Sequence, residues 1–192
     1  MTQHAANKAR TLLVRAFFYA AAVAGAGCGG SSNPLDNPPN VENGAGAQGR
    51  RLSFAYYQRC INPIFLANID NTTCAASGCH DNANGTGGAF RVIPGAATVD
   101  LANAANTPDV IRASDMYKNF YSSQGSVVIG APLESRLLNK PLVRGVLHGG
   151  GLILTSAQDP NARLIEFWIN RPAAQGQDEF SSDPSPGTCN TQ

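Results

Sequence analysis

Two cysteines and a histidine lie close together in the run Cys74-Ala75-Ala76-Ser77-Gly78-Cys79-His80. Two thiols can add across the two vinyl groups of a porphyrin, and a histidine directly after the second cysteine can bind the iron. Four residues separate the two cysteines here, whereas two are usual in this kind of attachment site. The run therefore indicates a covalently bound haem. Because its spacing is wider than usual, it is a weaker signal than the common motif, and other features of the chain must support it.

Two other interpretations of the same residues are a disulfide between Cys74 and Cys79 and a zinc site that also uses His80. The geometry disfavours zinc, because the adjacent Cys79 and His80 are awkward partners in one tetrahedral shell and the chain has no second compact Cys/His pair. A local disulfide in an exported protein remains the main alternative to haem.

The first 27 residues have the pattern of an export signal. Three basic residues precede an Ala-rich apolar stretch at residues 16–27, which is too short to span a membrane. The stretch ends in Gly-Ala-Gly before Cys28, and this resembles a bacterial lipoprotein signal whose cysteine becomes lipidated. An ordinary secretory signal is the alternative. Since Asp does not follow Cys28, the resemblance predicts a lipoprotein on the periplasmic side of the outer membrane.

The five cysteines fall into groups once the signal is set aside. Cys28 would carry lipid, and Cys74 and Cys79 would carry haem. An oxidising compartment then favours a disulfide between Cys60 and Cys189, although other pairings among these four non-lipidated cysteines remain open.

The chain has 192 residues, a net charge of +1 and 43% hydrophobic residues, which is typical of one globular domain with flexible ends. There is no excess of basic residues, so we do not expect a nucleic-acid partner. We predict a signal over residues 1–27, a Gly/Asn/Pro-rich tether over 28–50, a domain over 51–173 and a tail over 174–192 that is mobile except where Cys189 ties it down.

Apolar spacing and capping residues predict helices over residues 53–67, 107–121, 132–139 and 159–171. Ser53 is the expected N-cap of the first helix, and Pro63 should kink or restart it. In the next two helices we expect several side chains to face inward, namely Val110, Tyr117, Phe120, Tyr121, Leu133 and Leu137.

Several short segments over residues 57–172 resemble, in their order, the small cytochrome c domains of exported bacterial proteins. They are Cys60-Ile61-Asn62-Pro63-Ile64-Phe65, Ser77-Gly78-Cys79-His80, Gly87-Gly88-Ala89-Phe90, the run from Gly130 to Leu138 and Phe167-Trp168-Ile169. The resemblance implies an all-α fold, a small helical bundle with long irregular loops around a covalently bound haem. It also implies that the first and last helices cross near that haem.

The second axial ligand of the iron has two candidates in the mature chain. Many of these domains place a Met-Pro pair in a region where this chain has His148-Gly149-Gly150-Gly151. We favour His148, with Met116 as the alternative, because Met116 lies in a predicted helix where core packing is its expected role. Phe90, Tyr117, Phe120, Tyr121 and Trp168 are candidate walls of the haem site, with ordinary core packing as the alternative. Arg136, Lys140 and Arg144 could neutralise the propionates, although solvated surface charge is the more common role of such residues.

These features together predict an electron-transfer protein with one haem c, bound through Cys74 and Cys79, with His80 and His148 as axial ligands. Its partners would be a redox protein of the cell envelope and, through the lipid anchor, the membrane. With both axial positions filled we do not expect an enzyme, whereas ligation by His80 alone would leave a site for a small molecule. The competing hypothesis is a non-redox, disulfide-stabilised lipoprotein that binds within an envelope complex.

Overall fold

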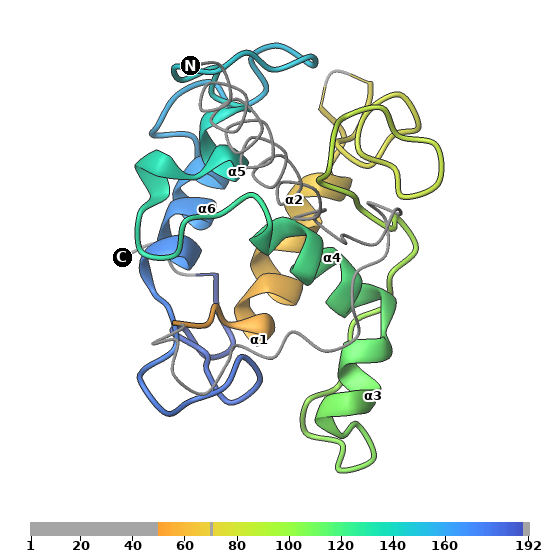
Figure 1. Cartoon of the computed structure of the whole chain (residues 1–192), viewed down its shortest axis with the longest axis vertical. Coiled ribbons are helices and arrows are strands. Elements are labelled where there is room, and N and C mark those ends of the chain that lie inside the picture. Colours follow the sequence, from red (N-terminus) through yellow and green to blue (C-terminus); the bar gives the residue numbers. More distant parts are fainter. Residues whose placement is uncertain (1–49, 70, 190–192) are drawn as a thin grey trace, which may run out of the picture. The chain divides into compact units, whose positions relative to one another are not determined.

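The computed structural model describes residues 50–69 and 71–189, which form helices joined by long irregular segments (Figure 1). These residues contain no strand, only isolated bridges between Ile69 and Thr72 and between Asp81 and Val92. A helix-rich chain of this kind agrees with the predicted all-α class. No helix of the described ranges is long and apolar enough to cross a membrane. The predicted signal, Cys28 and nearly all of the tether lie outside the described residues.

The first helical run consists of α1 (Phe54–Tyr56), the π-helical turn η1 (Tyr57–Ile61) and α2 (Asn62–Leu66). It begins as predicted at Ser53, whose hydroxyl oxygen accepts a hydrogen bond from the Tyr56 N–H. Pro63 does not end the run. A proline lacks an N–H and crowds the carbonyl four residues earlier, and the wider π turn just before it supplies the room.

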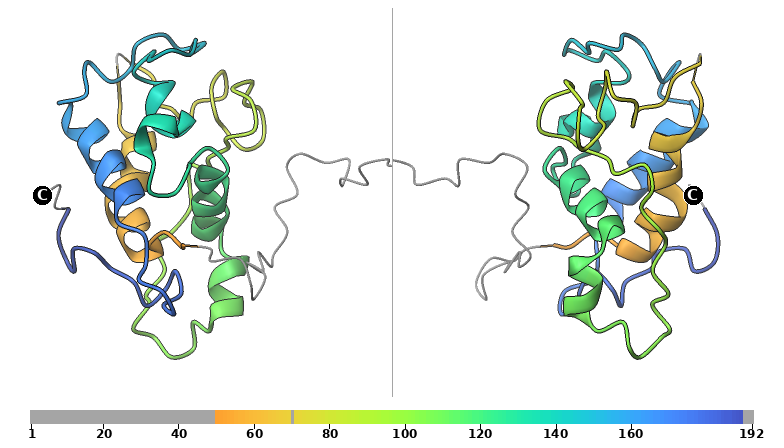
Figure 2. Two further views of the ribbon diagram at one scale, coloured as in Figure 1. Left: turned by 60° about the vertical axis from the view of Figure 1, so that its left-hand side comes forward. Right: turned by 90° about the vertical axis from the view of Figure 1, so that its right-hand side faces the viewer.

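The last helix, α6 (Pro160–Asn170), begins at Asp159, whose carboxylate accepts from the Asn161 N–H. It lies beside the first helical run in both views of Figure 2. The ring of Trp168 packs 5.3 Å from that of Tyr57, and Phe167 packs 5.3 Å from Tyr56. The predicted pairing of the first and last helices is therefore confirmed.

The predicted single helix over 107–121 is wrong, because the segment forms α3 (Pro108–Ala113) and α4 (Asp115–Gln124). Ser114 is extended between them, and its hydroxyl oxygen accepts from the Tyr117 N–H to cap α4. After the break, Ile111 still anchors α3 to the core, whereas Val110 is 51% exposed, and Tyr117 and Phe120 of α4 are buried. Ser114 followed by Asp115 is a strong signal for the start of a helix, but the prediction followed the apolar spacing, which continues across this pair.

The predicted helix over 132–139 is likewise divided, into the 3₁₀ turn η2 (Pro132–Glu134) and α5 (Arg136–Asn139). Ser135 is fully buried at the break, and its hydroxyl bonds the backbone of Val128 and Ala131. Leu137 faces inward as predicted. Leu133 does not, because it lies on the separate turn, where it is 66% exposed.

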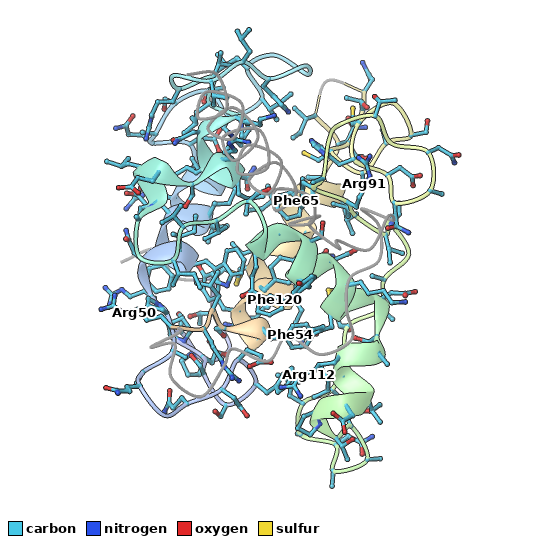
Figure 3. The ribbon with its side chains drawn as sticks, viewed as in Figure 1. Arg50, Phe54, Phe65, Arg91, Arg112 and Phe120 are labelled. Carbon is cyan, nitrogen blue, oxygen red and sulfur yellow. A yellow bond between two sulfur atoms is a disulfide. The ribbon has the colours of Figure 1, made fainter. Side chains whose placement is uncertain are left out.

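The core lies where these helices meet and is largely aromatic. Phe120 of α4 packs edge-on against Phe54 at 5.4 Å and against Tyr57 at 5.3 Å, and Figure 3 shows Phe54 and Phe120 between the helices. Edge-to-face pairs at such distances add stability beyond the area that they bury. This aromatic centre fixes how α4 and α6 lie against the first helical run.

The tail is tied down at Cys189 as predicted, but the expectation that the rest of it is mobile is wrong for residues 174–189. A disulfide joins Cys60 of η1 to Cys189, across 129 residues of sequence. Glu179 is buried, and its carbonyl accepts from the Phe54 N–H at 2.9 Å. Arg59 forms an ion pair with Asp183 at 3.0 Å. The tail is thus packed along the start of the first helical run rather than free in solvent.

Candidate functional site

The segment from Cys74 to His80 is folded into a compact turn. The His80 N–H donates to the Cys74 carbonyl at 2.9 Å, and the Cys79 N–H donates to the Ala76 carbonyl at 2.8 Å. The Ala75 N–H donates to the carbonyl of Phe65 at 3.1 Å, which attaches the turn to the end of α2. The extra two residues between the cysteines are therefore accommodated by a turn that is hydrogen-bonded within itself.

Cys74 and Cys79 are both free thiols of intermediate exposure. Burial raises the pKa of the Cys74 thiol, and the nearby Cys79 raises it further. The two sulfur atoms are thus close enough to interact electrostatically without being joined, whereas Cys60 and Cys189 are joined. This arrangement leaves both thiols of the motif available for bonding to another group.

The His80 ring is oriented by the segment that follows it. Its Nδ1 lies 3.0 Å from the Phe90 carbonyl oxygen, and the Phe90 ring packs 4.8 Å from the imidazole. The Val92 N–H donates to the His80 carbonyl, which ties the two segments together. A bond of Nδ1 to a carbonyl makes Nε2 the nitrogen that can bind a metal.

Burial lowers the pKa of His80, against the opposing effect of the bond to Phe90. The neighbouring basic groups of His148, Arg91 and Lys140 lower this pKa further. The neutral imidazole is thereby favoured, and it is the form that binds metal ions.

His148 lies directly opposite this ring in the Gly-rich loop between α5 and α6. The two ring centres are 6.2 Å apart and the ring planes differ by only 9°. The Nδ1 of His148 lies 2.9 Å from the carbonyl oxygen of Gly151, so Nε2 is again the nitrogen left for a metal. Gly151 has a φ of 73°, which glycine adopts without strain. Both loops lie at the same end of the domain (Figure 2).

The separation of the two rings agrees with two ligands on opposite sides of one metal ion. An imidazole nitrogen binds a first-row metal at about 2 Å and the ring centre lies roughly 1 Å farther, which places two such rings about 6 Å apart. The same distance and near-parallel planes also fall within the range of an offset-stacked pair of rings, so the separation is compatible with a shared metal and does not by itself require one. The residues present therefore fit a haem iron bound by His80 and His148.

The surroundings of His148 also suit an apolar macrocycle. Leu147 is 87% exposed and Leu152 is 61% exposed, on either side of the ligand candidate. Phe65 packs 4.9 Å from Phe90, on the side of His80. Large aliphatic side chains left open beside a candidate ligand are typical of a surface that another group covers.

Met116, the alternative ligand, lies elsewhere. It is 2% exposed and belongs to the core on α4, which is the packing role that its helix predicted. Of the proposed haem walls, Phe90 contacts the His80 ring. Tyr117, Phe120 and Trp168 instead pack with Phe54 and Tyr57 in the aromatic centre.

Basic side chains surround the paired histidines. Lys140 is one of the basic residues that we considered as partners of the haem propionates. Together with Arg91 it lowers the pKa of His80 through its charge. Sequence reasoning missed Arg91, although its place directly after Phe90 was a usable signal. Arg91 and Phe65 lie toward the same end of the domain in Figure 3.

Within the described ranges no group of three or more His, Cys, Asp or Glu side chains is arranged to hold a metal ion. A haem iron takes four of its six ligands from the porphyrin, so two histidines are sufficient for it. Comparisons with family models, curated proteins and solved structures find no match for this chain.

Proposed function

We propose that this chain is an electron-transfer protein that carries one haem c. Cys74 and Cys79 hold the porphyrin covalently, and His80 and His148 are the two axial ligands of its iron. The fold is a small cytochrome c-like bundle in which the two loops at one end enclose the cofactor.

The single observation that carries the proposal is the opposition of His80 and His148. Two loops far apart in sequence place two imidazoles 6.2 Å apart and within 9° of parallel. Each ring uses Nδ1 on a backbone carbonyl, of Phe90 or Gly151, and keeps Nε2 for the metal. Two free thiols precede the first of these histidines.

The bound haem supplies one-electron redox chemistry. The protein holds the imidazoles by hydrogen bonds to its backbone, so they need little rearrangement when the charge of the site changes. His80 and His148 occupy both axial positions and leave none for a substrate, which favours a carrier over an enzyme. Two imidazole ligands also give a lower reduction potential than one histidine and one methionine, because the methionine thioether favours reduced iron.

The proposed location follows from the sequence. Residues 1–27 direct export, Cys28 carries lipid, and the domain works on the periplasmic side of the outer membrane. Its partner is then another redox protein of the cell envelope. Export also suits the disulfide between Cys60 and Cys189, because such bonds persist in oxidising compartments.

The test is to express the full chain in a bacterial host that attaches haem c and to denature the purified protein. A haem absorption band that stays with the denatured polypeptide supports the proposal. A colourless protein would contradict it and favour the non-redox envelope lipoprotein. Substituting Cys74 and Cys79 with serine is the matched control, and this double variant should lose covalent haem.

Electron paramagnetic resonance of the oxidised protein tests the ligand pair. Two near-parallel imidazoles give a rhombic low-spin ferric signal, whereas perpendicular rings give a strongly anisotropic one. A sulfur-to-iron charge-transfer band in the optical spectrum would contradict His148 and point to Met116.

A further inference from the structure

We propose that Gly87 is a positioning residue that sets the ring plane of His80, and so the parallel alignment of His80 with His148. The inference rests on the proposed function, because the alignment matters for two ligands that share one iron. It concerns a residue that contacts the ligand and does not itself bind the metal.

The backbone of Gly87 lies directly against the His80 imidazole. A Cβ at this position would be 2.6 Å from both Cε1 and Nδ1 of the ring and 2.7 Å from the Cys79 carbonyl oxygen. Those distances are far inside van der Waals contact, so the ring or the backbone would have to move. Only glycine lets the chain pass this close to the ring.

The close approach is maintained by hydrogen bonds on either side. The Gly87 N–H donates to the Cys79 carbonyl at 2.7 Å, and the Thr86 hydroxyl donates to the Gly78 carbonyl at 2.9 Å. The Phe90 ring and carbonyl contact the same imidazole. His80 is therefore confined by Gly87 and Phe90 together, and its ring cannot turn freely.

Glycine at this position is required for space and not for backbone conformation. The neighbouring Gly88 has a φ of 84°, with no atom within 4 Å of an added Cβ. Gly87 is the opposite case, because its φ is not in the left-handed region whereas its Cβ position is blocked by the ligand ring. An alanine at 87 would act mainly through the contact with His80.

Gly85 provides a matched control in the same loop. Its Cβ would meet the Cys79 carbonyl at 2.7 Å, as at Gly87, and the Asp81 carbonyl at 2.5 Å, and its three nearest atoms are all backbone atoms of Cys79 and Asp81. Gly85→Ala thus disturbs the loop backbone first, whereas Gly87→Ala meets the His80 ring first. Gly95→Ala is the neutral control, because nothing lies within 4 Å of its Cβ and it is outside the Cys74–His80 motif.

The experiment compares the three holoproteins by paramagnetic resonance of the ferric form and by thermal unfolding. We expect Gly87→Ala to change the rhombic g-values and the haem absorption, Gly85→Ala to lower the unfolding temperature with unchanged g-values, and Gly95→Ala to change neither. Native g-values in Gly87→Ala, or equal spectral changes in Gly85→Ala and Gly87→Ala, would overturn the inference.

A measurement on the unsubstituted chain keeps the test decisive if Gly87→Ala does not fold. In the diamagnetic ferrous holoprotein we expect a strong nuclear Overhauser effect between Gly87 Hα and the His80 ring, and its absence overturns the inference. If the chain binds no haem, the proposed function fails separately. The same cross-peak in the haem-free protein then still supports or overturns the placement of Gly87.

Discussion

The indole N–H of Trp168 donates to the carbonyl oxygen of Ser53 at 3.0 Å, across 115 residues of sequence. Ser53 also caps α1, and its own hydroxyl donates to the Ser182 carbonyl. One fully buried serine therefore joins the first helix, the last helix and the C-terminal segment.

Under the proposed function, removal of the second ligand should change the spin state of the iron without releasing the haem. In His148→Ala the thioether bonds and His80 remain, so we expect covalent haem with a high-spin ferric absorption spectrum. The control is Met116→Leu, a core substitution of similar volume, which should keep the native spectrum and cost less than about 1.5 kcal/mol of stability. If Met116→Leu loses the low-spin spectrum and His148→Ala keeps it, the second ligand is Met116 and the assignment of His148 is wrong.

Glu179 should be important for stability, because it is the anion of a largely buried cluster. Its carboxylate bonds Arg51 at 2.8 Å, Arg112 at 3.1 Å and the Tyr117 hydroxyl at 3.2 Å. Glu179→Gln removes the charge between two arginines and should cost about 2 kcal/mol of unfolding free energy, measured with urea.

The comparison for Glu179 is Asp115→Asn, at an exposed ion pair with Lys118. Surface pairs contribute at most about 1 kcal/mol, so this variant should remain close to the native protein. Similar losses in the two variants would mean that the Glu179 cluster contributes no more than a surface contact.

Asp178 should make part of the stability depend on acidic pH. Burial alone would raise its pKa, but hydrogen bonds from Ser181 and the Phe180 N–H outweigh this and lower the pKa below its usual 3.8. The folded state thus binds its proton less readily than the unfolded chain. The stabilisation is present above pH 3.8 and is lost as the pH falls through the lower folded-state pKa.

The difference in unfolding free energy between the native protein and Asp178→Asn measures this effect. It should be constant near neutral pH and shrink as the pH falls below 3.8 and through the lower folded-state pKa. If this difference in unfolding free energy does not vary with pH, it arises from the new side-chain amide and not from the lost charge, and the prediction is wrong.

The disulfide between Cys60 and Cys189 should be a major source of stability. It closes a loop across 129 residues, and the loss of chain entropy in the unfolded state predicts up to about 5 kcal/mol. A double Cys→Ser variant should unfold at a lower temperature, and dithiothreitol should lower the unfolding temperature of the native protein and leave that of the variant unchanged. A native protein insensitive to the reductant would contradict the prediction.

The sequence by itself determined the local features of this protein. Ser53 and Asp159 are the N-caps of the two helices that the sequence predicts to begin there, because capping depends on groups within one turn of the chain. The cysteines left over by the haem motif, Cys60 and Cys189, are those that form the disulfide. Apolar spacing alone was less reliable, since Ser114 and Ser135 each interrupt a predicted helix.

Only the tertiary structure decided which distant residues meet. The approach of His148 to His80, the buried position of Met116 and the packing of residues 174–189 all depend on contacts between segments far apart in the chain. No spacing rule encodes such contacts, because they arise from how the aromatic core orients the helices and where the connecting loops then lie. The sequence identified the candidate ligands, and the packing of the helices and loops brought two of them, His80 and His148, within 6.2 Å of each other.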